Sequence, residues 1–170
     1  AGFPADTSFV SVAANSDTSF ALSSVGKLYG WGNNANGQLG DGTTVNRQTP
    51  VEVAVYGVVF TRIAVAYNHA LAIADDGTVY SWGKNTSGQL GDGSYINQLV
   101  PVPIDTSGIA GSKIFISVAA GNSFSLGVTE DGILYSWGEN SFTNKLGDGS
   151  GVNQSSPVLV STSNIASGAK

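Results

Sequence analysis

The residues best suited to acid–base chemistry are one histidine and two pairs of adjacent carboxylates. His69 is the sole histidine and cysteine is absent, so any nucleophilic triad would have to use His69. General acid–base catalysis also needs a partner group positioned beside the ring. No motif supplies one, and we expect His69 to be a partly buried ring that is bonded to a neighbouring unit of the fold.

The carboxylate pairs are Asp75-Asp76 and Glu130-Asp131. They would suit glycoside hydrolysis only if two carboxyl groups faced each other across a sugar. Both pairs fall on predicted hairpin turns instead, and adjacent residues of a strand point to opposite faces of a sheet. We therefore expect these four acids to be solvated turn residues.

A third candidate is a glycine-rich loop in which Asn34, Asn36 and Asp41 resemble the ligands of a calcium loop. Calcium requires several oxygen ligands with enough carboxylate charge, whereas asparagine is neutral. The aspartate recurs in every copy of an LGDG motif, as Asp41, Asp92 and Asp148, where we expect its side chain to fix a turn. No catalytic residue, cofactor or metal ligand is therefore assigned.

These residues belong to an internal repeat that is present three times. The copies read LYGWGNNANGQLGDG from Leu28, VYSWGKNTSGQLGDG from Val79 and LYSWGENSFTNKLGDG from Leu134. The tryptophans, spaced 51 and then 55 positions apart, are Trp31, Trp82 and Trp137. The motif's last leucine is followed each time by a glycine, namely Gly40, Gly91 and Gly147. A period of about 50 residues is typical of propeller blades and solenoid units.

Each repeat is predicted to form four strands, which in the first copy span residues 9 to 14, 18 to 24, 27 to 32 and 50 to 55. Alternating apolar residues support the second strand, and a proline is expected to open the fourth, where no ladder donor is needed. A two-residue type I′ turn is predicted between the second and third strands, because Asp76-Gly77 and Asp131-Gly132 suit its dihedrals better than Val25-Gly26 does.

Four strands per repeat predict an all-β protein of the propeller type with three four-stranded blades. The blades are expected at about residues 9 to 55, 60 to 104 and 115 to 160, within one partial propeller that spans residues 1 to 170. The tryptophans are expected to pack as large apolar rings between blades, with their indole donors bonded nearby.

The middle repeat resembles the regulator of chromosome condensation (RCC1-like) repeat. The matching positions are Asn68-His69-Ala70, Asp76-Gly77, Tyr80-Ser81-Trp82-Gly83, Asn85, Gly88-Gln89-Leu90-Gly91 and Pro101. The other copies depart from it at Thr18 and Phe124, which replace the histidine, and at Thr143-Asn144-Lys145, which replaces the Gly-Gln pair. The resemblance implies a β-propeller, usually of seven blades, that acts through protein contacts.

Three blades alone leave two sheet faces uncovered, so something must cover them. Either this chain lacks the remaining blades of a longer propeller, or identical chains close a ring. Two copies would give six blades, and closed dimers are the commonest oligomers. Because the chain begins and ends at repeat boundaries, we expect a homo-oligomer, with the longer propeller as the alternative.

Composition and charge narrow the functional classes. The formal net charge is −5, which opposes a large phosphate-binding surface and hence nucleic-acid binding. The sequence has no apolar run of 18 residues or more, so no membrane span is predicted. Only 11% of the residues are charged, a composition that favours a secreted, cell-surface or virion-surface protein and leaves a cytoplasmic one open.

The function expected from these observations is a non-enzymatic protein-interaction or surface-assembly module. The resemblance also implies an alternative, a propeller that regulates a partner, either as a guanine-nucleotide exchange factor or as a secreted enzyme inhibitor. Such a propeller would need a binding patch on its loops. The candidates for it are aromatic residues outside the repeat pattern, namely Tyr56, Tyr67, Tyr95 and Phe142.

Overall fold

The structure is a computed structural model and describes residues 3 and 7–161. Within this part of the chain twelve strands form three four-stranded antiparallel sheets. The first sheet contains β1 (Phe9–Ala14), β2 (Thr18–Ser23), β3 (Leu28–Gly32) and β4 (Arg47–Glu52). The second contains β5 (Phe60–Val65), β6 (His69–Ala74), β7 (Val79–Gly83) and β8 (Gln98–Pro103). The third contains β9 (Phe115–Ala120), β10 (Phe124–Thr129), β11 (Leu134–Gly138) and β12 (Gln154–Leu159).

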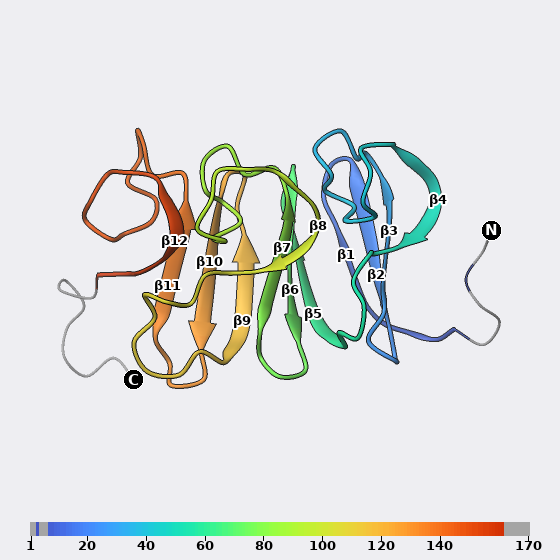
Figure 1. Ribbon diagram of the computed structural model, residues 1–170, viewed down its shortest axis with the longest axis horizontal. Helices are drawn as coiled ribbons and strands as arrows, with labels where there is room; N and C mark the ends of the chain where they lie inside the picture. Colours follow the sequence, from blue (N-terminus) through green and yellow to red (C-terminus); the bar gives the residue numbers. More distant parts are fainter. Residues whose placement is uncertain (1–2, 4–6, 162–170) are drawn as a thin grey trace.

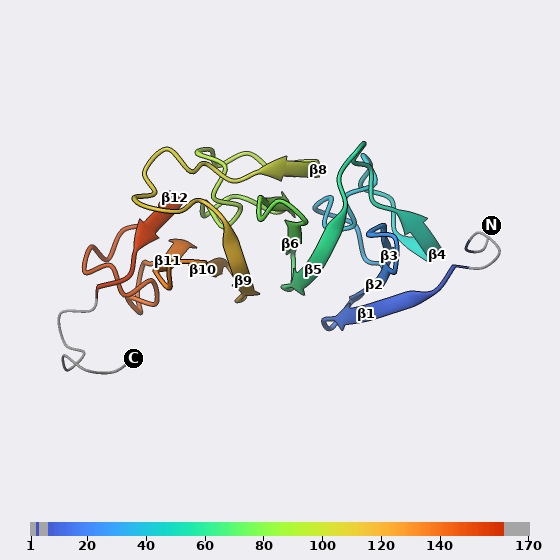
Figure 2. The same cartoon turned by 90° about the horizontal axis from the view of Figure 1, so that it is seen from below.

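Every sheet follows the chain order of its strands, and the three sheets stand side by side (Figure 1). The first strands, β1, β5 and β9, contact one another in series and line the inner side of an arc, whereas β4, β8 and β12 lie on its outer side (Figure 2). This is the predicted all-β architecture of the propeller type. The described residues contain no helix of the length and hydropathy that a membrane span requires.

The fourth strand of each sheet begins earlier than the proline pattern predicts. β4 starts at Arg47, and Pro50 is its fourth residue instead of its first. The pairing of β3 with β4 is irregular where it steps from Gly30 opposite Val51 to Gly32 opposite Arg47, and Pro50 lies inside this step. Proline is tolerated there because an edge strand at a bulge does not need its N–H in the ladder. β8 and β12 have the same arrangement.

The predicted type I′ turn between the second and third strands is wrong. Such a turn needs positive φ at both central residues, but Gly77 has φ 82° and Asp76 is not in the positive-φ region. Gly77 donates its N–H to the Ala74 carbonyl, and Ala74 donates to the Thr78 carbonyl. These bonds match a three-residue loop whose final glycine is left-handed. Because only the glycine is left-handed, the first copy tolerates Val25 in this turn.

Two apolar clusters fill the junctions between neighbouring sheets. The first junction buries Phe20, Leu22, Leu28, Leu39, Val53, Phe60, Ala70, Ala72 and Trp82. The second buries Leu71, Ile73, Val79, Ile104, Ile109, Phe115, Tyr135 and Trp137. The middle sheet contributes to both, so all six residues of β6 are buried. The core therefore lies between sheets, and each sheet depends on a neighbour to cover its apolar face.

Candidate interaction surfaces

Each junction between sheets is built from a tryptophan of one sheet and the Leu-Gly loop of the sheet before it. Trp82 is fully buried, and its Nε1 donates to the Gln38 carbonyl at 2.9 Å. Gly40, which has φ +70°, lies against the same ring, because a Cβ at this position would come within 2.8 Å of Trp82 Nε1. The close approach and the left-handed backbone both require glycine at position 40.

The second junction repeats this contact with one difference. A Cβ on Gly91 would lie 2.6 Å from Nε1 of Trp137, which is also fully buried. The Gln89 carbonyl, which corresponds to the acceptor in the first junction, receives the Ser125 hydroxyl at 2.8 Å instead. The expectation of a bonded indole donor is therefore correct for Trp82 and wrong for Trp137, whose Nε1 has no hydrogen-bond partner among the described residues. The contact between the tryptophan ring and the glycine is what both junctions share.

The two ends of the arc expose the two halves of one further junction. Trp31 is only partly buried, because no described sheet precedes its own. At the other end Gly147, with φ +64°, meets no tryptophan, and the atom nearest to a Cβ there would be Val160 Cγ1 at 3.3 Å. The first sheet thus presents a partly exposed tryptophan, and the third presents an exposed Gly147, although Leu146 beside it is buried.

Exposed aliphatic side chains accompany both ends. Val10 and Val12 of β1 are 65% and 77% exposed. Ile63 and Val118 occupy the position of Val12 in the other two sheets, and both pack against the junction with the preceding sheet, so Val12 lies on the face of the first sheet that points away from the second sheet. On the third sheet Leu134 and Leu159 are exposed. Leu134 is equivalent to Leu28 and Val79, which the two junctions bury, so Leu134 belongs to the exposed end of the third sheet. On the first sheet Phe3 packs against Phe9 and Tyr29 and covers part of the end.

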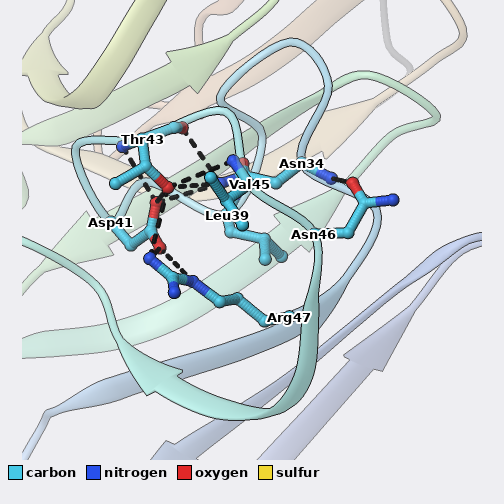
Figure 3. A network of polar contacts seen from close by, with 7 residues as sticks. All are labelled: Asn34, Leu39, Asp41, Thr43, Val45, Asn46 and Arg47. Carbon is cyan, nitrogen blue, oxygen red and sulfur yellow. Dashed lines mark hydrogen bonds and ion pairs between the residues drawn. The ribbon is translucent and has the colours of Figure 1, made fainter.

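The recurring aspartate organises the loop between the third and fourth strands (Figure 3). Asp41 accepts hydrogen bonds from Asn34 Nδ2 at 2.9 Å and from the Thr43 hydroxyl at 2.7 Å, and Arg47 Nε donates to its second oxygen at 2.6 Å. Burial disfavours the ionised carboxyl, but the bonds from Thr43, Arg47 and Asn34 outweigh it and hold the pKa of Asp41 below its usual value. Both carboxylate oxygens of Asp41 accept hydrogen bonds from residues of this loop and of the strand that follows it, and the same is true of Asp92 and Asp148 in the other copies.

A buried asparagine stands at the centre of each loop, and its structural role was not predicted: Asn34 was considered only as a calcium ligand and Asn85 only as a position of the family resemblance. Asn85 is fully buried, accepts the Leu90 N–H at its Oδ1 and donates from Nδ2 to Asp92. Its own N–H donates to Asn97 Oδ1 at 2.8 Å. A signal was available, because an asparagine follows each tryptophan by three residues and another precedes each proline by four. The constant spacing reflects a loop that is closed by side-chain amides.

His69 is fully buried, and the expectation that it is only partly buried is wrong. Its Nε2 lies 2.9 Å from the Ser125 hydroxyl of the neighbouring sheet, which confirms the expected bond between His69 and a neighbouring unit of the fold. Because Ser125 donates its proton to the Gln89 carbonyl, His69 Nε2 must be the donor in this pair. Burial lowers the pKa of His69 to about 3. The neutral ring therefore joins β6 to β10 through a hydrogen bond and is inaccessible to solvent and substrate.

The carboxylate pairs lie on the turns where they were expected. Asp76 Oδ1 accepts the Thr78 N–H at 2.9 Å, and this bond is the main cause that lowers the pKa of Asp76. Glu130 Oε1 accepts the Ser112 hydroxyl, and Asp131 Oδ2 accepts the Ser112 N–H. The two pairs close separate turns of different sheets and do not face each other across a common site.

The four non-repeated aromatic residues do not form one patch. Tyr56 and Phe142 are fully exposed, whereas Tyr67 and Tyr95 are 44% and 52% exposed. Strand order places Tyr67, Tyr95 and Phe142 at one end of the sheets, in connections that leave β5, β7 and β11, and it places Tyr56 at the opposite end, between β4 and β5. Phe142 also has φ 75°, an uncommon conformation for a bulky residue.

Tyr56 borders a hollow of about 290 Å³ at the first junction, whose walls include the apolar Leu28, Val53 and Phe60 as well as the ion-paired Lys27 and Glu52. The equivalent residues of the second junction pack against Ile109, which comes from the longer connection between β8 and β9. The hollow beside Tyr56 therefore lies where the second junction is filled by an aliphatic side chain of the chain itself.

Three antiparallel four-stranded sheets, arranged with their first strands on the inside and joined by ring-on-glycine junctions, define a protein of the β-propeller class. The regulator of chromosome condensation (RCC1) repeat profile matches residues 25–73 and 76–128. A second profile of this repeat matches residues 9–38, 60–89 and 115–143. The chain belongs to the RCC1 repeat family.

Similar proteins include the RCC1 domain-containing protein RUG3, mitochondrial, from Arabidopsis thaliana, which is 39% identical over 129 residues that cover 75% of this chain and 28% of RUG3. The E3 ubiquitin-protein ligase HERC2 from Homo sapiens is 32% identical over 164 residues, which cover 92% of this chain and 3% of HERC2. The chain therefore spans less than a third of these relatives.

Solved structures of RCC1-type propellers superpose on this chain and are also longer than it. The crystal structure of Prp20p from Saccharomyces cerevisiae, whose report names its binding properties to Gsp1p and histones, superposes with a TM-score of 0.80 at 26% identity. The alignment covers 92% of this chain and 39% of Prp20p. Human WBSCR16 superposes with a TM-score of 0.78 at 25% identity, covering 91% of this chain and 38% of WBSCR16.

Proposed function

We propose that this chain is a non-enzymatic protein-interaction module whose two terminal sheets each pack against a further repeat of the same kind. The observation that carries the proposal is the pair of half-junctions, with Trp31 partly exposed at one end and Gly147 without a tryptophan at the other. Both internal junctions bury these same two elements against each other.

A second copy of the chain is the proposed source of the missing halves. Its third sheet would place a Leu-Gly loop under Trp31, and its first sheet would place a tryptophan over Gly147. Two such contacts related by a twofold axis close a ring of six blades. The alternative source is further repeats of a longer polypeptide, which the greater length of the relatives supports.

The proposed partner class is protein, and two observations support it. Prp20 has been crystallised with Kap60, so a fold like this one binds a protein in that case. The loop end of this chain also exposes Phe142 in a left-handed conformation, and Tyr67 and Tyr95 lie in loops at the same end of the sheets, where we propose a partner contact. These exposed aromatic residues favour a second candidate function, a propeller that regulates a bound partner protein.

The mass of the purified chain in solution tests the ring. Light scattering behind a sizing column should give twice the 17.3 kDa of one chain. Val12→Asp would put a charge on the uncovered face of the first sheet and should return the chain to a monomer. Val45→Asp, at an exposed loop position, is the matched control and should leave the doubled mass unchanged.

A monomeric wild-type chain would reject self-association. The half-junctions would then be expected to bind a separately produced array of repeats of this family, and Trp31 fluorescence would report that contact. A dimer that persists in Val12→Asp would reject the terminal face of the first sheet as the contact.

A further inference from the structure

The inner side of the arc carries a row of equivalent residues that breaks the repeat pattern. Ser11, Arg62 and Ser117 stand two positions after the phenylalanine that opens β1, β5 and β9. Two of the three copies therefore have serine where the middle copy has arginine. The row lines a hollow of about 380 Å³ that spans the three inner strands, which lie side by side in Figure 2.

Arg62 is the charged group of this hollow. It is exposed and makes no ion pair within the part of the chain that the structure describes. Arg47 differs, because Asp41 neutralises it. The hollow is lined by Arg62 together with Ser11, Thr61, Ile63, Ser117 and Val118, so no carboxylate lies in its wall.

Donors surround Arg62 on both sides. The hydroxyls of Ser11 and Ser117 are not engaged in hydrogen bonds with other described residues, whereas the Thr61 hydroxyl already donates to the Ile73 carbonyl. β1, β5 and β9 are the first strands of their sheets and are paired on one side only, so each also presents unpaired backbone N–H groups along its inner edge.

We propose that this hollow binds an oxyanion, the carboxylate or phosphate group of a ligand, with Arg62 as the central contact and the hydroxyls of Ser11 and Ser117 beside it. A guanidinium presents a planar fork of N–H donors that matches either group. Serine hydroxyls donate to the remaining lone pairs. The chain carries a net charge of −5, so its overall field repels anions and the local contact with Arg62 must hold the ligand.

The site is independent of the proposed pairing of terminal sheets, because all its groups come from strands of one chain. Acetate and inorganic phosphate are the probes, titrated separately into the isotope-labelled 170-residue chain at constant ionic strength while backbone amide signals are followed by NMR. We expect saturable shifts at residues 61–63 and at Ser11 and Ser117. Saturation by acetate alone would identify a carboxylate ligand, and saturation by phosphate alone a phosphorylated one.

Arg62→Gln should weaken binding of the probe at least tenfold, since a hydrogen-bonded ion pair is lost. Lys84→Gln is the matched control: it removes the same charge at a position that does not line the hollow, and it should leave the affinity unchanged. The remaining amide signals of both variants report that the fold is intact. The proposal is overturned if neither probe saturates, if Arg62→Gln binds as well as the wild type, or if Lys84→Gln weakens binding equally.

Discussion

The buried His69 should make the stability of this protein depend on pH between 7 and 5. Its pKa is about 3 in the folded chain and 6.5 in an unfolded one, so the unfolded state binds more protons throughout this range. The resulting stability is fully present above pH 6.5 and is lost as the pH falls. Between pH 7 and pH 5 linkage predicts a loss of about 2 kcal/mol, and the full difference approaches about 5 kcal/mol near pH 3.

The carboxyl groups whose pKa is lowered on folding act below this pH range, whereas His69 acts within it. Hydrogen bonds lower the pKa of Asp41, Asp76 and Asp131 in the folded state, and a lowered carboxylate pKa costs stability only as the pH falls below the ordinary value of 3.8. His69 is also the sole histidine of the chain. We therefore assign a pH dependence of the free energy of unfolding between pH 7 and pH 5 to His69.

Urea unfolding at half-unit steps of pH measures this slope. The wild type should lose about 2 kcal/mol from pH 7 to pH 5, about a thirtyfold change in the unfolding equilibrium. His69→Gln can still donate to Ser125 and does not titrate, so its stability should be level over the same range, whatever its absolute value. In the folded wild type, the NMR shifts of the imidazole carbon-bound protons should not change above pH 4.5.

Two results would refute the reasoning. One is an imidazole that titrates near pH 6.5 in the folded protein, which would mean that solvent reaches the ring. The other is a His69→Gln variant with the same slope as the wild type, which would assign the pH dependence to another group.

Two further predictions concern the junctions and their loops. Gly91→Ala should lower the free energy of unfolding by about 2 kcal/mol or more, because it adds a Cβ within 2.6 Å of Trp137 to the cost of a left-handed alanine. Gly57→Ala is the control: Gly57 also has a positive φ, +73°, but open space surrounds it, so the loss should be only about 1 kcal/mol. Chemical denaturation compares the two variants, and equal losses would contradict the packing argument. Asp41→Ala should cost about 2 kcal/mol at pH 7, and less once the pH falls below the lowered pKa of Asp41, where the wild-type carboxyl is itself protonated. A variant as stable as the wild type at pH 7 would show that Thr43 and Arg47 hold the loop without this carboxylate.

Much of the fold could be predicted because its signals are local in the chain. Alternating apolar residues, turn glycines and a tryptophan that recurs every 50 residues or so specify strands and their number without knowledge of the neighbours. The same pattern predicted that the recurring tryptophans would pack between sheets, as Trp82 and Trp137 do.

Two of the incorrect predictions, the start of the fourth strand and the type of the hairpin turn, concern features that depend on pairing with a second strand. Pro50 was expected to open its strand, yet β4 begins three residues earlier, where Arg47 lies opposite Gly32 of β3, since an edge strand needs no N–H at a bulge. The turn before β7 was assigned from the Asp76-Gly77 pair alone, whereas the hydrogen bonds of Ala74 with Gly77 and Thr78 close a three-residue loop. Pairing partners, which residue preferences do not encode, set both features.

The repeat pattern in the chain thus specifies what each unit is, since every blade is built by contacts between residues that are near in sequence. What each copy of a motif does depends on its place in the stack. Trp82 is fully buried and Trp31 is not, although both occupy the same position of the motif, because among the described residues only Trp82 has a sheet before its own. The hollow around Arg62 likewise exists only because three strands from different repeats meet on the inner side of the arc.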